Sequence, residues 1–273
     1  MAVMTIPFTK AHGAGNDFLL SWSDQVPAGD LASLARAICN RHTGIGADGW
    51  MLVQGTSLHD TGIRLFNADG SEAEISGNGT RCAAALLLDS GRAKGDVTIT
   101  TGAGPKHLRL IDRSGRRFLF EMDMGQPVFH QQQLRFLLPL RHGAQEVTIL
   151  DVGNPQCVVF VDRFPPDWPA VGAEIEAHPH FPKRTNVSFV RPVDQHTIEV
   201  RFYERGAGVT LSSGTGSTGA AVAAILRESA ASPVRVLASG GEALDLRWDK
   251  SVYLTGPAEI VGAGEFYVNA GQK

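Results

Sequence analysis

Two serines, Ser76 and Ser213, each open a glycine-rich turn that runs into an alanine-rich stretch. Serine is a preferred N-cap and alanine favours a helix, so each segment predicts a helix that begins just after its serine. Backbone N–H groups at a helix N-terminus bind carboxylates or phosphates, and glycine lets such a ligand approach the backbone. Simple N-capping would explain either serine alone. It does not explain the polar residues that accompany the serines, which are Asn67, Asn78, Glu204 and Arg205. We therefore interpret the two segments as anion-binding helix ends.

The two serine segments lie half a chain apart, and other landmarks keep nearly the same offset. Gly15-Asn16 is echoed by Gly153-Asn154, and Asn67 is echoed by Glu204. Such a long period indicates an internal duplication rather than a solenoid. Two facing copies would bring the serines to one interlobe cleft. Their side-chain oxygens would then lie on the order of 7 Å apart if each approaches one carbon at near-attack range.

The pattern along the chain predicts an α+β fold with two pseudo-symmetric lobes, each a strand-rich, barrel-like sheet around a central helix. We expect an N-terminal lobe at 1–122, completed by 262–273, and a C-terminal lobe at 123–261. Asp30 is a plausible N-cap for a helix at 31–39. The central helices are expected at 77–88 and 214–227. The expected strands are 18–23, 50–53, 63–66, 97–101, 107–111, 117–122, 147–152, 157–161, 187–191 and 197–203, followed by four late segments that include 234–238 and 251–254.

Composition limits the classes of partner. The net charge of −3 gives no sign of a nucleic-acid or membrane partner, and no apolar run reaches the roughly 18 residues of a membrane span. The N-terminus lacks a signal-peptide pattern, so a cytoplasmic protein with a small-molecule substrate is expected. A homodimer is a possible assembly that the sequence does not decide. The cysteines, Cys39, Cys82 and Cys157, are odd in number and are expected to be buried apolar residues rather than disulfides or nucleophiles.

Two segments, 44–49 and 214–219, spell the G-x-G-x-x-G pattern of dinucleotide-binding folds. That motif needs a strand directly before it and a helix directly after it. The first copy follows a predicted helix, and residues 206–213 separate the second from its strand. The His178-Pro179-His180 sequence lacks acidic or cysteine ligands at matching spacing. We therefore expect no cofactor and no metal.

A series of segments resembles one known family, the diaminopimelate epimerases. They occur in order over nearly the whole chain: 12–18 (HGAGNDF), 41–49 (RHTGIGADG), 67–72 (NADGSE), 77–82 (GNGTRC), 153–155 (GNP), 185–187 (TNV) and 204–208 (ERGAG). The resemblance implies two pseudo-symmetric lobes and a cofactor-independent isomerase. It implies inversion of one α-carbon, from LL- to meso-diaminopimelate, in the biosynthesis of lysine and peptidoglycan precursors.

The resemblance also implies roles for individual residues. The family holds the distal, unreacting end of its substrate through positions that match Asn67, Asn154, Asn186 and Arg205. The reacting end is held by positions that match Asn16 and the backbone of Gly77-Asn78 and Gly214-Thr215.

The residues that do the chemistry differ from the family pattern. The family uses two cysteines as base and acid, and those positions are Ser76 and Ser213 here. In the family, a histidine and a glutamate together tune the cysteines. The glutamate matches Glu204 here, whereas the histidine position holds Gln156. A cysteine thiol titrates near pH 8.5, whereas a serine hydroxyl is a far weaker acid that needs an adjacent base.

Three interpretations of the serines therefore remain open. The chain is an epimerase that runs on Ser76 and Ser213, a relative with another isomerase or elimination activity, or a catalytically silent protein that binds amino acids. A variant mutated to trap substrate would belong to the last class. The further departures at Ser212 and Ser217 favour natural divergence.

Overall fold

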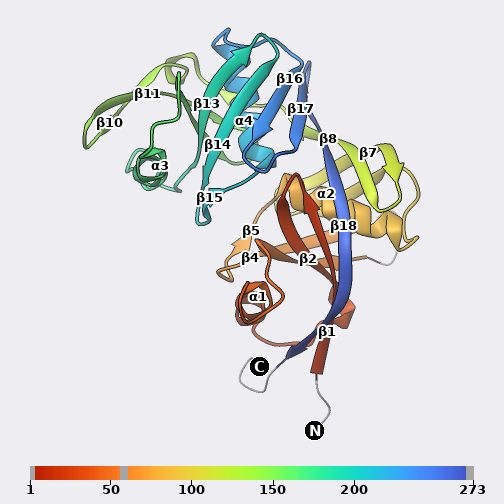
Figure 1. Cartoon of the computed structure of the whole chain (residues 1–273). Helices are drawn as coiled ribbons and strands as arrows, with labels where there is room; N and C mark the ends of the chain where they lie inside the picture. The colour runs from red at the N-terminus through yellow and green to blue at the C-terminus, as the bar shows by residue number, and fades with distance from the viewer. Residues whose placement is uncertain (1–3, 56–60, 269–273) are drawn as a thin grey trace. The chain divides into compact units, whose positions relative to one another are not determined.

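The computed structural model describes residues 4–55 and 61–268, which fall into two compact units (Figure 1). Unit 1 comprises Met1–Met122 and Pro257–Lys273, and unit 2 comprises Asp123–Gly256. The chain passes between the units within β8 (Arg117–Gly125) and within β18 (Val252–Val268). The chain returns to unit 1 at Pro257, five residues before the start of the expected segment 262–273. Residues 269–273 of that segment lie outside the described residues.

Unit 1 is built from strands that pair in a closed ring. Among its described residues, eight strands follow one another in the order β18, β1, β2, β3, β4, β6, β7, β8 and back to β18. The pair β2–β3 and the pair β4–β6 are parallel. A short strand, β5 (Glu72–Ala73), adds to β4. The ring strands not yet bounded are β1 (Met4–Gly13), β2 (Asn16–Trp22), β3 (Gly49–Gln54), β4 (Gly62–Asn67), β6 (Val97–Thr101) and β7 (Gly104–Ser114).

A buried helix, α2 (Gly77–Asp89), is the central element of unit 1. Residues 77–88 are all buried, and the helix contacts β1, β2, β3 and β6. Burial on every side explains why alanine and leucine fill the second half of the helix, residues 83–88. Outside the ring, α1 (Leu31–Cys39) begins at Asp30, whose carboxylate accepts from Ser33 N as predicted. The apolar face of α1 packs into a cluster with Trp50.

Unit 2 repeats the element order of unit 1. Its β12–β13 and β14–β16 pairs are parallel, as β2–β3 and β4–β6 are in unit 1. The central helix α4 (Gly214–Leu226) is buried over 214–224 and contacts β11 to β14, β16 and β17. The repeated elements are β11 (Gly143–Asp151), β12 (Pro155–Phe160), α3 (Trp168–Glu176), β13 (Asn186–Asp194), β14 (Thr197–Glu204), β15 (Gly208–Thr210), β16 (Val234–Ala238) and β17 (Ala243–Trp248). The matching order and directions confirm the predicted duplication and the pseudo-symmetric α+β fold.

A few elements lie outside the duplicated pattern. They are the strands β9 (Val128–Phe129) and β10 (Phe136–Leu140) and the single 3₁₀ turns η1 (Ser23–Gln25) and η2 (Gln131–Gln133). β9 and β10 both pair with β11. No helix in the described part of the chain is long and apolar enough to cross a membrane.

Candidate functional site

Ser76 and Ser213 are the N-caps of the two central helices, as predicted. Both have extended backbone angles, and their hydroxyl oxygens accept from Gly79 N at 3.1 Å and from Gly216 N at 3.0 Å. The cap satisfies the N–H of the third helical residue. The N–H groups of the first residues of a helix find their partners outside that helix, either in other groups of the chain or in a ligand. Each helix therefore begins with a local geometry suited to a carboxylate.

Glycine at the third helical position keeps each cap intact. A Cβ added at Gly79 would lie 2.6 Å from Met51 Cε. A Cβ at Gly216 would lie 2.9 Å from Ser213 Oγ and 2.8 Å from Phe202 Cδ1. At Gly216 an added Cβ would crowd the capping hydroxyl of Ser213, and at Gly79 it would push the end of the Met51 side chain aside.

In unit 2 a carboxylate lies beside the serine. Ser213 Oγ donates to Glu204 Oε2 at 2.9 Å, and Thr210 Oγ1 donates to Glu204 Oε1 at 2.5 Å. Ser213 is buried, with 3% of its surface exposed. Glu204 is the last residue of β14, next to the turn that leads to β15 and α4. A carboxylate within hydrogen-bonding reach of a serine hydroxyl is the arrangement that a serine base requires.

The corresponding position of unit 1 is different. β4 ends at Asn67, where β14 ends at Glu204. Asn67 Nδ2 donates to Ser71 Oγ at 3.0 Å. An amide cannot accept a proton as a carboxylate does, so Asn67 gives Ser76 no counterpart of Glu204. The two serine sites are alike in backbone geometry and unlike in acid–base chemistry.

The other predicted residues of unit 2 are linked to one another, and Asn154 contacts the start of α4. Asn154 Nδ2 donates to Thr215 Oγ1 at 3.3 Å, and Gln156 Nε2 donates to Asn154 Oδ1 at 2.7 Å. Gln156 is the register partner of Asn186 in the parallel β12–β13 pair. Asn186 Oδ1 accepts from Arg205 N at 3.0 Å. The structure therefore brings these residues together within unit 2.

Gln156 stands where the resemblance implies a histidine. It is fully buried, and its Oε1 has no hydrogen-bond partner among the described residues. It also packs closely on α4, because a Cβ at Gly219 would lie 2.8 Å from its Cγ. The hydrogen bond that it donates goes to Asn154, so Gln156 orients an amide rather than tuning a thiol.

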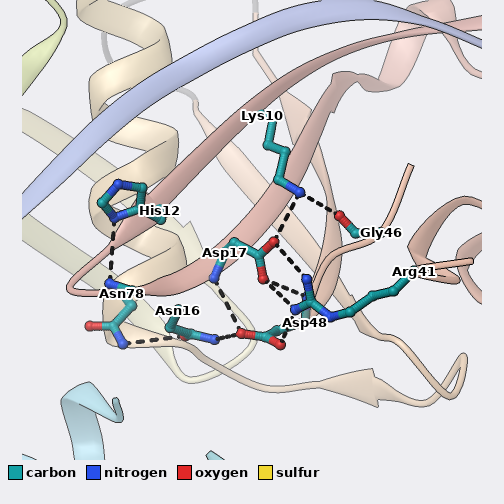
Figure 2. Close-up of polar contacts among 9 residues, drawn as sticks. Lys10, His12, Asn16, Asp17, Arg41, Gly46, Asp48 and Asn78 are labelled. Carbon is teal, nitrogen blue, oxygen red and sulfur yellow. Dashed lines mark hydrogen bonds and ion pairs between the residues drawn. The ribbon is translucent and has the colours of Figure 1, made fainter. Parts of the chain in front are cut away.

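Asn16 and Asn78, the predicted polar residues at the reacting end, lie in one hydrogen-bond network in unit 1 (Figure 2). Asn78 Nδ2 donates to Asn16 Oδ1 at 3.2 Å, and Asn16 Nδ2 donates to Asp48 Oδ2 at 2.6 Å. Arg41 Nη2 contacts Asp17 Oδ1 and Asp48 Oδ1, each at 2.7 Å. Sequence reasoning included Arg41 and Asp48 in a family-like segment but gave them no role in the site.

Asp17 anchors one side of this network. Burial raises the pKa of its carboxyl, but hydrogen bonds and charge attraction from Arg41 and Lys10 outweigh burial and hold that pKa below its ordinary value. Lys10 Nζ lies 3.0 Å from Asp17 Oδ2 and also donates to Gly46 O at 2.7 Å. Because the pKa of Asp17 is lower in the folded state, its ionised carboxylate stabilises the fold at pH values above the pKa that it has in the unfolded chain. That stability is lost as pH falls through the folded-state pKa.

We expect the Asp17→Asn variant to lose part of the acid sensitivity of folding. Below about pH 4, near the ordinary pKa of aspartate, its free energy of unfolding should fall less steeply than that of the unmodified chain. Urea unfolding followed by circular dichroism at a series of pH values measures this slope. Asp24→Asn, at an exposed aspartate, is the control. Equal slopes for the Asp17 variant and the unmodified chain would contradict the assignment.

None of the three cysteines has the environment of a reactive thiol. Cys39, Cys82 and Cys157 are all buried and free. Burial raises the pKa of Cys39 and of Cys82 to about 12, and it raises the pKa of Cys157 as well. A nucleophilic or basic cysteine acts as its thiolate, which a raised pKa disfavours. The cysteines therefore do not replace the two that the family pattern would place at Ser76 and Ser213.

We expect thiol alkylation to leave the native protein largely unmodified. Iodoacetamide at neutral pH should label the folded chain slowly and all three thiols rapidly in denaturant, as mass spectrometry would show. Any activity of the folded chain should survive the treatment. Rapid loss of activity together with labelling of one native cysteine would contradict this expectation.

Comparison with known proteins agrees with this architecture. Residues 8–130 and 148–261 match the family described as "Diaminopimelate epimerase". A diaminopimelate epimerase of Pelotomaculum thermopropionicum is 40% identical, over 95% of this chain and 98% of its own length. A diaminopimelate epimerase of Desulfovibrio desulfuricans is 38% identical, over 98% of this chain and 100% of its own length.

Solved structures share the fold at lower identity. A hydroxyproline epimerase from Agrobacterium vitis superposes with a TM-score of 0.75 at 17% identity, covering 97% of this chain and 93% of that chain. A PhzF-family phenazine biosynthesis protein of Bacillus anthracis superposes with a TM-score of 0.69 at 15% identity, covering 97% and 99%. These neighbours establish the fold, and the full-length curated relatives establish the family. The chain belongs to the diaminopimelate epimerase family.

Proposed function

We propose that this protein is a cofactor-independent isomerase that interconverts LL- and meso-diaminopimelate in the biosynthesis of lysine and peptidoglycan precursors. Family membership supports the substrate and the reaction. The observation that carries the proposal for this chain is the hydrogen bond from Ser213 to Glu204. It places a base beside the serine that replaces a catalytic cysteine. A protein that only binds amino acids has no need of that pairing.

In the proposed reaction, Ser213 and Glu204 act together on one face of the α-carbon. Glu204 accepts the hydroxyl proton of Ser213 as the serine oxygen takes the α-proton, which leaves a carbanion on the substrate. Ser76 donates its hydroxyl proton to the opposite face and recovers a proton from solvent, while Glu204 releases the proton it accepted to solvent. The configuration inverts, and no atom other than hydrogen is exchanged.

The remaining predicted residues divide between the two ends of the substrate. Asn16 and the N–H groups of Gly77-Asn78 and Gly214-Thr215 would hold the reacting end. The two helix N-termini would favour its carboxylate and the negative charge that develops in the transition state. The proposed distal set is Asn67, Asn154, Asn186 and Arg205. A guanidinium can bind a carboxylate in bidentate form, so Arg205 would select a substrate with a second carboxylate.

The direct test is conversion of the pure isomers. The protein is incubated separately with LL- and with meso-diaminopimelate, and the isomers are separated by chiral chromatography. Both reactions should converge on the same mixture. Alanine, which lacks a distal carboxylate, should bind poorly by calorimetry. Tight binding of diaminopimelate without conversion from either side would overturn the proposed activity.

A further inference from the structure

Four side chains of unit 1 form a continuous hydrogen-bond relay that ends at the start of α2 (Figure 2 shows the part from Asn78 to Arg41). Arg81 Nη2 donates to Asn78 Oδ1 at 2.6 Å, Asn78 Nδ2 donates to Asn16 Oδ1 at 3.2 Å, and Asn16 Nδ2 donates to Asp48 Oδ2 at 2.6 Å. We call Arg81, Asn78, Asn16 and Asp48 the amide relay. It connects a buried arginine on the helix to an exposed aspartate beside β3.

The chemistry of the two end groups fixes the direction of the relay. A guanidinium has only donors and an ionised carboxylate has only acceptors. A side-chain amide has a donor group, the NH₂, and an acceptor, the oxygen. Arg81 at one end therefore requires the oxygen of Asn78. Asp48 at the other end requires the nitrogen of Asn16. With both ends fixed, each amide has a single orientation that satisfies every hydrogen bond.

Both ends of the relay are held in place. Arg81 is fully buried and also donates through Nε to Pro257 O at 3.1 Å and through Nη1 to Gly77 O at 3.3 Å. Asp48 accepts from Arg41 Nη2 at 2.7 Å and from Asp17 N at 3.2 Å. Neither end can turn over without losing further hydrogen bonds, so the polarity of the relay is a stable property of unit 1.

We propose that Asp48 is a positioning residue that sets the side chain of Asn16 as a hydrogen-bond donor toward the substrate. Asn16 Nδ2 carries two hydrogens, and Asp48 takes one of them; the other has no partner among the described residues. Its oxygen is turned toward Asn78. Asn16 thus presents an N–H group, which suits a carboxylate and not an ammonium. This inference rests on the proposed function, in which Asn16 holds the reacting end.

The Asp48→Asn variant tests the polarity without changing shape. Arg41 would attract the new amide oxygen, so the new NH₂ group would face Asn16 and turn it over. A donor would then meet a donor within the relay, because Arg81 at the far end still only donates. We expect the dissociation constant for diaminopimelate to rise about tenfold or more, and KM to rise more than kcat falls, since an unsatisfied polar group costs affinity.

Two further variants separate polarity from stability. Arg41→Gln removes the ion pair between residues 41 and 48 but leaves the carboxylate of Asp48 in place. Its dissociation constant for diaminopimelate should therefore stay within about threefold of that of the unmodified chain. Asp89→Asn removes ion pairs with Arg113 and Arg116 elsewhere in unit 1 and should behave likewise. A purely structural role for Asp48 predicts equal losses for Asp48→Asn and Arg41→Gln, and that result would overturn the proposal.

A ligand-free measurement keeps the inference separate from the proposed function. In ¹H–¹⁵N spectra, Asp48→Asn should shift the side-chain amide signals of both Asn16 and Asn78, whereas Arg41→Gln should leave those of Asn78 in place. Unchanged Asn78 signals in the Asp48 variant would overturn the relay whatever the substrate is. Failure of the unmodified chain to convert diaminopimelate, with the shifts as expected, would overturn only the proposed function and the assignment of the ligand.

Discussion

Replacement of Glu204 by glutamine is expected to slow α-proton exchange on diaminopimelate by about 10² to 10⁴-fold, the usual contribution of a positioned base. Ser213 donates its hydroxyl proton to Glu204 at 2.9 Å, and Thr210 donates to the other carboxylate oxygen. Glutamine keeps the shape of the side chain but cannot accept the proton. The dissociation constant for the substrate should change little, because the effect lies in the transition state.

The matched control is Glu199→Gln, on the same strand as Glu204. Glu199 pairs with Arg191 and has no contact with Ser213 among the hydrogen bonds described. Its removal should leave kcat within about twofold, since ion pairs at this level of exposure contribute little. An active Glu204→Gln variant, within a few-fold of the unmodified chain, would show that Ser213 does not depend on this base.

Replacement of Ser76 and Ser213 together by cysteine is expected to raise α-proton exchange by about 10²-fold or more, within the range of general acid–base effects. Both positions cap the N-terminus of a buried helix, where the pKa of a thiol is lowered. A cysteine at either position therefore supplies a more accessible base than serine. Each single variant should gain less, because inversion needs a group on both faces of the carbon.

Ser90→Cys provides the control for the added thiol. Ser90 is the C-cap of α2, at the end of the helix where the dipole disfavours a thiolate. That variant should show no gain in exchange. If the double cysteine variant binds diaminopimelate and gains nothing, the site has diverged beyond its acid–base pair, and the assignment of Ser76 and Ser213 to catalysis is wrong.

Much of the fold could be predicted because local signals agree with tertiary structure. The caps at Asp30, Ser76 and Ser213 fixed the starts of three helices, and apolar runs located most strands to within a few residues. Helix α3 was missed; its Pro169 lies in the first turn, where proline is tolerated, and Gly172 lowers its helix propensity. The structure explains the glycine, since a Cβ at Gly172 would lie 2.9 Å from Tyr203 Cβ. Strands β1 and β10 were also missed, because β1 lacks a clear alternation and β10 contains Pro139.

The candidate site could be predicted only in part. The sequence identified the serines, the asparagines and Glu204, but it could not give the direction of a hydrogen bond between residues far apart in the chain. The role of Asp48 depends on such a contact with Asn16. The same holds for Arg81, whose Nε reaches Pro257 O from the other end of the chain. That Ser76 and Ser213 act on one α-carbon stays a prediction.

Proton NMR of LL-diaminopimelate in heavy water follows the α-proton itself and so shows whether this protein removes it. With the unmodified protein, we expect deuterium to replace the α-proton at the inverted centre as the meso form appears, and Glu204→Gln to suppress both changes together. Conversion that retains the original proton, or binding with no exchange under saturating substrate, would show that Ser213 and Glu204 do not remove the α-proton.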